Sequence, residues 1–186
     1  MPSTAQKNLL QKLHEYIPQE APEIAAKERI VSFVEREPNC FERSLECGHI
    51  TASAWLVSRD FSKALLMLHT KLGIWVQLGG HSDGNPDVLA VAIQEAREES
   101  GIQGIRAVSD KIFDLDVHLI PSSPGIKEHH HYDIRFLLQV ATDEEVVQNR
   151  ESKALQWFGQ NLDDLPTGEP SILRMHSKWL KVLSAY

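Results

Sequence analysis

The chain has few cysteines, no excess of positive charge and no long apolar run. Its 186 residues include 2 cysteines, Cys40 and Cys47, which are not spaced as a CxxC pair. Two cysteines in a chain of this size cannot build the disulfide framework of a small secreted domain, so a reduced, cytoplasmic setting is the simpler expectation. The sequence shows neither a basic start followed by an apolar segment nor a run of about 18 apolar residues, and therefore predicts no signal peptide and no membrane span.

The shortage of basic residues limits the kinds of molecule that the protein is expected to bind. The formal net charge is −7 at pH 7. Binding of a nucleic-acid polymer requires a basic face that displaces counterions, so this charge argues against such a partner. A small phosphorylated substrate remains compatible, because a divalent cation can supply the positive charge. Oligomeric state cannot be read from the sequence, and a homodimer is left open.

Hydrophobic residues make up 42% of the chain, which is ordinary for a globular domain. A helical N-terminal extension over residues 1–47 is expected to precede the main domain over residues 48–186. We expect the extension to pack on that domain, with a substrate lid or a dimer contact as the alternatives. Hydrophobic periodicity predicts helices over 4–16, 22–36 and 171–183 and strands over 50–57, 64–69, 111–120 and 131–140.

A helix predicted over Asp87 to Gly101 carries three glutamates, Glu95, Glu98 and Glu99, near its C-terminal end. Helix positions three and four apart are neighbours, and each like-charge pair at this spacing costs about 0.2–0.5 kcal/mol. Carboxylates at this end also oppose the helix dipole. Three hard oxygen ligands on one surface are what a magnesium ion accepts. A triplet of glutamates taken alone is more often a solvated acidic face, but the residues upstream of the helix favour the metal site here.

The segment before this helix supports the same interpretation. Residues 75–81 read as a short apolar strand that runs into a glycine pair. Asn85 is the expected N-cap, Pro86 suits the first helical position, and Gly101 supplies the left-handed cap at the other end. Because Gly80 has no Cβ, its backbone carbonyl can approach the ion that the glutamates hold.

Gly80 followed by Gln94-Glu95-Ala96-Arg97-Glu98-Glu99-Ser100-Gly101-Ile102 resembles the Nudix box, in which a glycine precedes a helix with a fixed pattern of glutamates. The glutamate, glycine and aliphatic positions match in register. The resemblance covers roughly residues 48–166, because Trp157-Phe158 and the turn over residues 162–166 are similar to the segments that commonly end such domains.

Two positions depart from the box. Its loop acid falls on Pro86, and its arginine falls on Gln94. Asp83 or Asp87 could take the place of the loop acid. In the family the arginine usually orients the helix glutamates through a salt bridge, so Gln94 puts their detailed geometry in question.

The resemblance implies an α/β fold of the α+β type, with a mixed β-sheet between helices. It implies metal-dependent hydrolysis of a phosphoanhydride in a nucleoside diphosphate linked to another moiety, with Mg²⁺ or Mn²⁺ as cofactor. Glu98 or Glu151 would act as the base; Glu144 and Glu145 lie in the same loop as Glu151 and are alternatives. The expected metal ligands are the Gly80 carbonyl, Glu95, Glu98 and Glu99.

Three consecutive histidines, His129 to His131, lie at the start of the strand predicted over 131–140. On a strand, His129 and His131 share a face with Asp133 and Arg135. The sequence has no pair of histidines one helical turn apart and no paired-cysteine motif, and so predicts no zinc site. An exposed polar face and a substrate-lining face remain open; under the second, Arg135 would replace the missing box arginine. The residues expected to bind substrate are His81, His131, Asp133 and Arg135.

Two other functions remain open at this stage. The departures at Pro86 and Gln94 are compatible with a non-catalytic Nudix-like module that binds a nucleotide. A diphosphate isomerase-like enzyme is the other, although neither Cys40 nor Cys47 follows a motif for that chemistry. The identity of the substrate cannot be read from composition, because loops and extensions set it.

Overall fold

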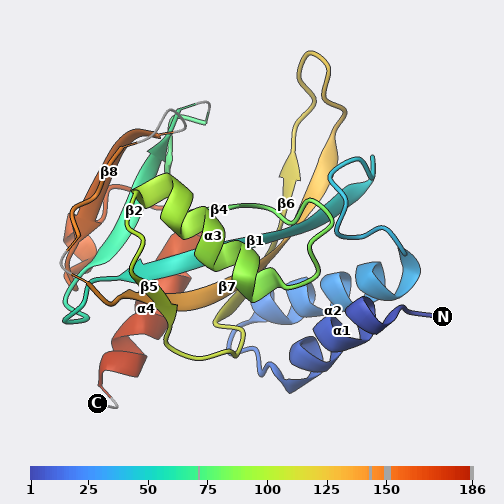
Figure 1. The fold of residues 1–186 in the computed structure, drawn as a ribbon, viewed down its shortest axis with the longest axis horizontal. Coiled ribbons are helices and arrows are strands. Elements are labelled where there is room, and N and C mark those ends of the chain that lie inside the picture. The colour runs from blue at the N-terminus through green and yellow to red at the C-terminus, as the bar shows by residue number, and fades with distance from the viewer. Residues whose placement is uncertain (71, 143, 149–151, 185–186) are drawn as a thin grey trace.

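The computed structural model describes residues 1–70, 72–142, 144–148 and 152–184 (Figure 1). None of the helices in this part of the chain combines the length and the apolar character that crossing a bilayer requires. The elements in chain order are α1 (Thr4–Glu15), α2 (Ala21–Arg36), β1 (Gly48–Val57), β2 (Ala64–His69), β3 (Trp75–Val76), β4 (Leu78–His81), α3 (Val88–Ser100), β5 (Ile105–Ala107), β6 (Asp114–Ile120), β7 (His129–Val140), β8 (Ser152–Phe158), the 3₁₀ turn η1 (Leu162–Asp164) and α4 (Pro170–Leu183).

The strands form one mixed sheet around β1. β1 pairs in parallel with β7 along its whole length and antiparallel with β2 and β4. β7 also pairs antiparallel with β5 and β6, and β2 pairs antiparallel with β3 and β8. A parallel pair flanked by antiparallel strands confirms the mixed sheet and the α+β class that the sequence predicted.

Helices cover both faces of this sheet. In Figure 1 α3 crosses in front of β1 and β4, and α4 lies behind the strands. On the first face Ile50 and Ile134 join a core that includes residues of α3, α1 and α2. On the opposite face Trp55 and Leu137 pack with Trp179 of α4. The alternation along β1 and β7 therefore separates two apolar cores.

Residues of α1 and α2 share the first core with the sheet. The side chain of Ser3 accepts a hydrogen bond from the backbone of Gln6, and the Gln6 side chain accepts one from Ser3, which forms a capping box at the start of α1. Ile30 and Phe33 of α2 are buried in the first core, and the Phe33 ring stacks on Tyr132 with the centroids 3.8 Å apart. A domain boundary at residue 47, a lid role and a dimer contact stay predictions.

The N-cap of α3 lies two residues later than the predicted N-cap. The helix begins at Val88, and the N-cap is Asp87, whose carboxylate accepts a hydrogen bond from the Ala90 N–H at 3.1 Å. Asn85, the predicted cap, instead accepts a hydrogen bond from the Asp87 N–H at 3.0 Å. Asparagine and aspartate are both good N-cap residues, so residue type alone did not distinguish Asn85 from Asp87. The predicted left-handed cap at Gly101 is confirmed, with φ at 76°.

Two strands were predicted incompletely. β6 begins at Asp114 rather than at residue 111, and β5 was not predicted. β5 has 3 residues, and it exists because Ile105 to Ala107 pair with the end of β7. A segment this short carries no periodicity that a sequence can reveal.

Candidate metal and substrate site

The last turns of α3 lie against the glycine pair of β4. Glu99 is 3% exposed, and its carboxylate accepts a hydrogen bond from the Gly79 N–H at 2.7 Å. A Cβ added to Gly80 would lie 2.5–2.7 Å from the carboxylate atoms of Glu95. A side chain at position 80 would therefore displace the Glu95 carboxylate from its position.

Glu98 is held differently. Its carboxylate is exposed and accepts a hydrogen bond from the Gln94 side-chain amide at 2.8 Å. Gln94 occupies the position of the box arginine, so it keeps a contact to one glutamate without supplying positive charge. Arg97 does not replace it, because its guanidinium donates to the Ile105 carbonyl oxygen at 3.3 Å.

This group of oxygens suits a hard divalent cation. Carboxylate and backbone carbonyl oxygens are the ligands that Mg²⁺ prefers, and the Glu95 carboxylate lies in the space beside the Gly80 backbone that a Cβ would fill. Glu95 and Glu99 lie one helical turn apart beside the glycine pair. The donor atoms of all three glutamates do not, however, lie within 4.8 Å of one another. Their assignment as ligands, with Gly80, stays a prediction.

The loop acids do not fill the position that Pro86 leaves. The carboxylate of Asp83 pairs with Arg43, and the hydrogen bond from Arg43 holds the pKa of Asp83 below its usual range. Asp87 is used as the helix cap. Glu42, which the sequence did not single out, places its carboxylate beside Gly84, where an added Cβ would lie 2.7 Å from its oxygen. It is the acidic group that the tertiary structure brings to this loop.

The predicted base Glu151 lies outside the described residues. Of its two alternatives, Glu144 accepts hydrogen bonds from the backbone N–H groups of Gln103 at 2.6 Å and Gly104 at 3.0 Å. These hydrogen bonds hold the loop that contains Glu144 against the segment that follows α3.

Asp133 of β7 lies at the centre of a polar patch on the second face of the sheet. Its carboxylate accepts hydrogen bonds from Thr51 at 3.0 Å, from Ser53 at 2.7 Å and from Gln77 at 3.2 Å. Asp133 is 3% exposed. Thr51 and Ser53 lie on β1, and Gln77 lies between β3 and β4, so the patch depends on tertiary structure rather than on sequence proximity.

Arg135 is not placed to meet a phosphate. It is 2% exposed and pairs with Asp133 at 2.7 Å, with Asp114 at 3.2 Å and with Asp116 at 3.3 Å. The hypothesis that it replaces the box arginine is wrong, because its guanidinium is enclosed by three aspartates on the second face of the sheet. Its predicted contact with substrate is not favoured for the same reason.

The ion pairs around Arg135 and Asp114 extend to helices α2 and α4. Asp114 accepts hydrogen bonds from Arg174 at 2.9 and 2.8 Å and from Lys178 at 2.8 Å. Lys178 of α4 also pairs with Glu23 of α2 and donates to the Tyr16 hydroxyl at 2.7 Å. Although burial alone would raise the pKa of Asp114, the hydrogen bond from Arg174 and the nearby positive charges lower it. Sequence reasoning missed this network, because its members are far apart in the chain.

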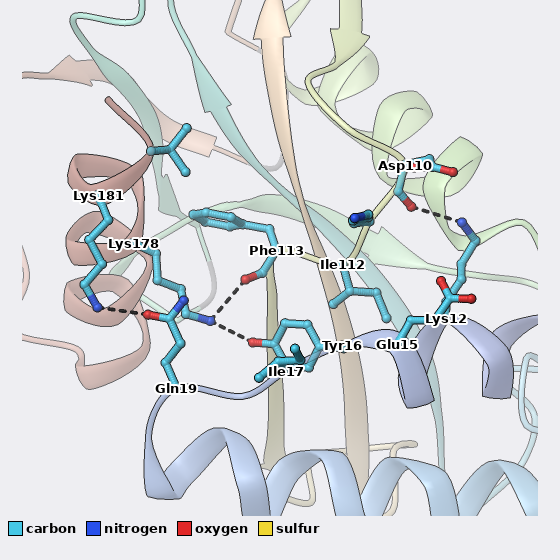
Figure 2. A pocket seen from close by; sticks show the side chains of 12 residues that line it. Lys12, Glu15, Tyr16, Ile17, Gln19, Asp110, Ile112, Phe113, Lys178 and Lys181 are labelled. Atoms are coloured by element: carbon cyan, nitrogen blue, oxygen red, sulfur yellow. Dashed lines mark hydrogen bonds between the residues drawn. The ribbon is translucent and has the colours of Figure 1, made fainter. Parts of the chain in front are cut away.

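An open cavity of about 850 Å³ lies at the outer end of this network (Figure 2). Figure 2 shows Lys178 reaching from α4 toward Tyr16 and the Phe113 carbonyl, and Lys181 reaching toward Gln19. None of the described residues predicted for the metal or substrate site lines this cavity. It marks the junction between the N-terminal helices and α4.

Five histidines gather on the sheet beside the glycine pair. In the strand register His49 pairs with His131, and His131 with His118. The His131 ring lies 4.9 Å from that of His49, 5.3 Å from that of His118 and 5.1 Å from that of His129, centroid to centroid. His81 lies 5.0 Å from both His49 and His131. The sequence indicated the shared face of His129 and His131 but missed His49, which only strand pairing brings to them.

Two of these histidines are neutral near pH 7. Burial lowers the pKa of His49 to about 4 and that of His131 to about 2, and the neighbouring histidines lower both further. His49 is 3% exposed, and neither of its ring nitrogens has a hydrogen-bond partner among the described residues. The Leu45 backbone, which does not meet the geometry of a hydrogen bond, raises the pKa of His49 in opposition to burial. An unsatisfied buried polar group costs about 1–3 kcal/mol, so the position of His49 requires an explanation.

No protein-family model and no curated protein matches the chain, but solved structures do. A hydrolase of the NUDIX family from Clostridium perfringens is 25% identical, covers 73% of this chain and 97% of its own, and has a TM-score of 0.51. A MutT NUDIX hydrolase from Burkholderia pseudomallei is 25% identical, with 69% and 95% covered and a TM-score of 0.52. A UDP-X diphosphatase, 15% identical, covers 96% of this chain and 93% of its own, with a TM-score of 0.51. With its mixed sheet, its glycine pair and the glutamate helix packed on it, the chain belongs to the Nudix hydrolase superfamily.

Proposed function

We propose that the chain hydrolyses a phosphoanhydride bond in a nucleoside diphosphate linked to another moiety, with Mg²⁺ or Mn²⁺ as cofactor. The observation that carries this proposal is the placement of Glu95 against Gly80 and of Glu99 on the Gly79 N–H. Two carboxylates fixed beside a glycine pair supply the negative oxygens that a divalent cation needs. One structural neighbour is named as a UDP-X diphosphatase, which supports the same bond type.

Glu95, Glu99 and the Gly80 carbonyl are the proposed ligands, with Glu98 at their edge. When bound, a divalent cation neutralises pyrophosphate charge and acidifies a water molecule. The hydrogen bond from the Gly79 N–H fixes the Glu99 carboxylate before any ligand arrives. Such preorganisation reduces the rearrangement that binding requires.

Glu98 is the proposed base among the described residues, because its carboxylate is exposed at the end of the helix while Gln94 limits its rotation. It would accept the proton of the attacking water. A carboxylate is a weak base in water, but a fixed position near the reacting group compensates for much of this deficit. Glu151 is retained as the second candidate from the sequence.

We also propose that His81 binds substrate. It is half-buried and directly follows Gly80. His131 lies beside it, with the ring centroids 5.0 Å apart. For Asp133 and Arg135 we propose a positioning role beneath these histidines rather than contact with substrate, because both are buried in their own ion pair. Cys40 and Cys47 are both free cysteines. A cytoplasmic location remains the expectation from the sequence.

The test is a screen of nucleotide sugars, dinucleotides and nucleoside triphosphates with Mg²⁺ or Mn²⁺, scored for release of phosphate or pyrophosphate. Glu99→Gln is expected to abolish hydrolysis while the circular dichroism spectrum stays that of the wild type. Glu28→Gln, which removes an exposed glutamate of α2, is the matched control and should keep full turnover. Wild-type turnover in Glu99→Gln would refute the assignment.

A non-catalytic nucleotide-binding module is the second candidate, favoured by Pro86 and by the neutral Gln94 contact to Glu98. It would give a heat of nucleotide binding in calorimetry without release of phosphate from any member of the panel. An isomerase-like activity ranks last, because Cys40 is completely buried and burial raises its pKa to about 12, which leaves the thiol unreactive.

A further inference from the structure

The histidine cluster contains a group of side chains with the spacing of a metal site. The ligand nitrogens of His49, His129 and His131 all lie within 4.8 Å of one another. Among the described residues this is the one group of three or more histidine, cysteine, aspartate or glutamate side chains that meets this spacing. The three members come from β1 and β7, whose parallel pairing is continuous through this region.

The spacing of two of these nitrogens matches tetrahedral zinc. The Nε2 atoms of His129 and His131 are 3.3 Å apart. Imidazole nitrogens bind Zn²⁺ at about 2.0–2.1 Å, and two such ligands at a tetrahedral angle are about 3.3–3.4 Å apart. One edge of the coordination tetrahedron is therefore already present, and a ring nitrogen of His49 lies within 4.8 Å of both of these ligand atoms.

The orientation of His129 also matches a ligand. Its Nδ1 lies 2.8 Å from the Lys127 carbonyl oxygen, which can only accept, so Nδ1 carries the proton and Nε2 keeps its lone pair. Metal-bound histidines usually donate their second ring nitrogen to a carbonyl or a carboxylate in this way. The lone pair of His129 is thus directed at His131.

His49 provides an independent observation. Its ring is 97% buried and directed into the cluster, and neither nitrogen has a hydrogen-bond partner in the part of the chain that the structure describes. Buried polar side chains are normally paired. A metal ion bound by His49, His129 and His131 would supply the missing partner.

We propose that His49, His129 and His131 form a second metal site, separate from the glutamates of α3, that binds a borderline transition-metal ion such as Zn²⁺. Three imidazoles suit zinc and leave a fourth position for water, whereas the glutamates and the Gly80 carbonyl offer the hard oxygens that suit Mg²⁺. His81 and His118 lie around the site, with rings 5.0 and 5.3 Å from that of His131. The two sites therefore differ in ligand chemistry.

The alternative is a metal-free polar surface that lines the substrate site. A phosphate needs donors, and the half-buried His129 and His131 could provide them. Buried His49, however, has no hydrogen-bond partner among the described residues in that arrangement. The metal accounts for all three side chains, so it is the explanation we adopt.

The experiment is a titration of the whole chain with Zn²⁺ by isothermal calorimetry in an excess of Mg²⁺, which occupies the glutamate site. We expect one equivalent of Zn²⁺ to bind. A parallel titration with Co²⁺ should give the visible absorption of a four-coordinate site with nitrogen ligands. Neither readout requires hydrolysis, so failure of this site and failure of the proposed function are distinguishable.

His129→Gln and His49→Gln should each weaken Zn²⁺ binding by more than about 100-fold, since even residues behind the ligands commonly contribute 10–100-fold. His130→Gln is the matched control: it changes the adjacent histidine, which pairs with Gly48 and lies on the other side of the strand. If His49→Gln fails to fold, His129→Gln decides, because its side chain is partly exposed. Absence of Zn²⁺ binding in the wild type, or equal affinity in His129→Gln and His130→Gln, would overturn the proposal.

Discussion

Replacement of Asp114 by asparagine is expected to destabilise the fold more than any change to a surface ion pair. Asp114 is 0% exposed and accepts charge-assisted hydrogen bonds from Arg174, Lys178 and Arg135 at 2.8–3.2 Å. Asparagine has almost the same shape, so packing is kept while the charge that the cations share is removed. Breaking a buried ion pair in this way costs about 3–5 kcal/mol, because the remaining charges stay buried without compensation.

For a chain of this size each kcal/mol lowers the Tm by about 2–4 °C, so the expected loss is about 6–20 °C. Urea and thermal unfolding followed by circular dichroism would measure both quantities. The control is Glu46→Gln, which removes an exposed pair between Glu46 and Lys127 at 2.8 Å and should cost less than about 1 kcal/mol. A loss in Asp114→Asn no larger than in this control would show that the network does not stabilise the fold.

The remaining predictions concern pH, the glycine pair and the thiols. Because the pKa of Asp114 is lowered by folding, its contribution to stability is present above the unfolded value of about 3.9 and is lost as the pH falls through the folded value. Urea midpoints should therefore decline below about pH 4, less steeply in Asp114→Asn; parallel declines would refute this. Gly80→Ala should displace the Glu95 carboxylate and reduce Mg²⁺ affinity in calorimetry, and an unchanged affinity would count against the site. A thiol reagent at pH 8 should label the exposed Cys47 rapidly and the buried Cys40 only in denaturant, whereas two fast thiols in the native chain would contradict the burial of Cys40.

Local patterns were sufficient for most of the fold. The alternation over residues 131–140 and the apolar spacing in α1, α2 and α4 predicted elements that the structure contains. Gly101 marked the end of α3 because a left-handed cap favours glycine. The box residues from Gly80 to Ile102 identified the superfamily, since their spacing along one helix is a property of the sequence itself. Errors occurred where two local signals competed, as at the start of α3, or where a short strand depends on its neighbour, as for β5.

The partners of the buried charged and histidine side chains were decided by tertiary structure alone. Arg135 looked like a phosphate ligand from its face on the strand, but Asp114 on the adjacent strand and Arg174 on α4 make it part of a closed network. His49 had no pattern around it, and only the parallel register of β1 and β7 sets it beside His131. The physical reason is that helix and strand periodicity fixes the face on which a side chain lies, whereas pairing between distant strands fixes what it meets there.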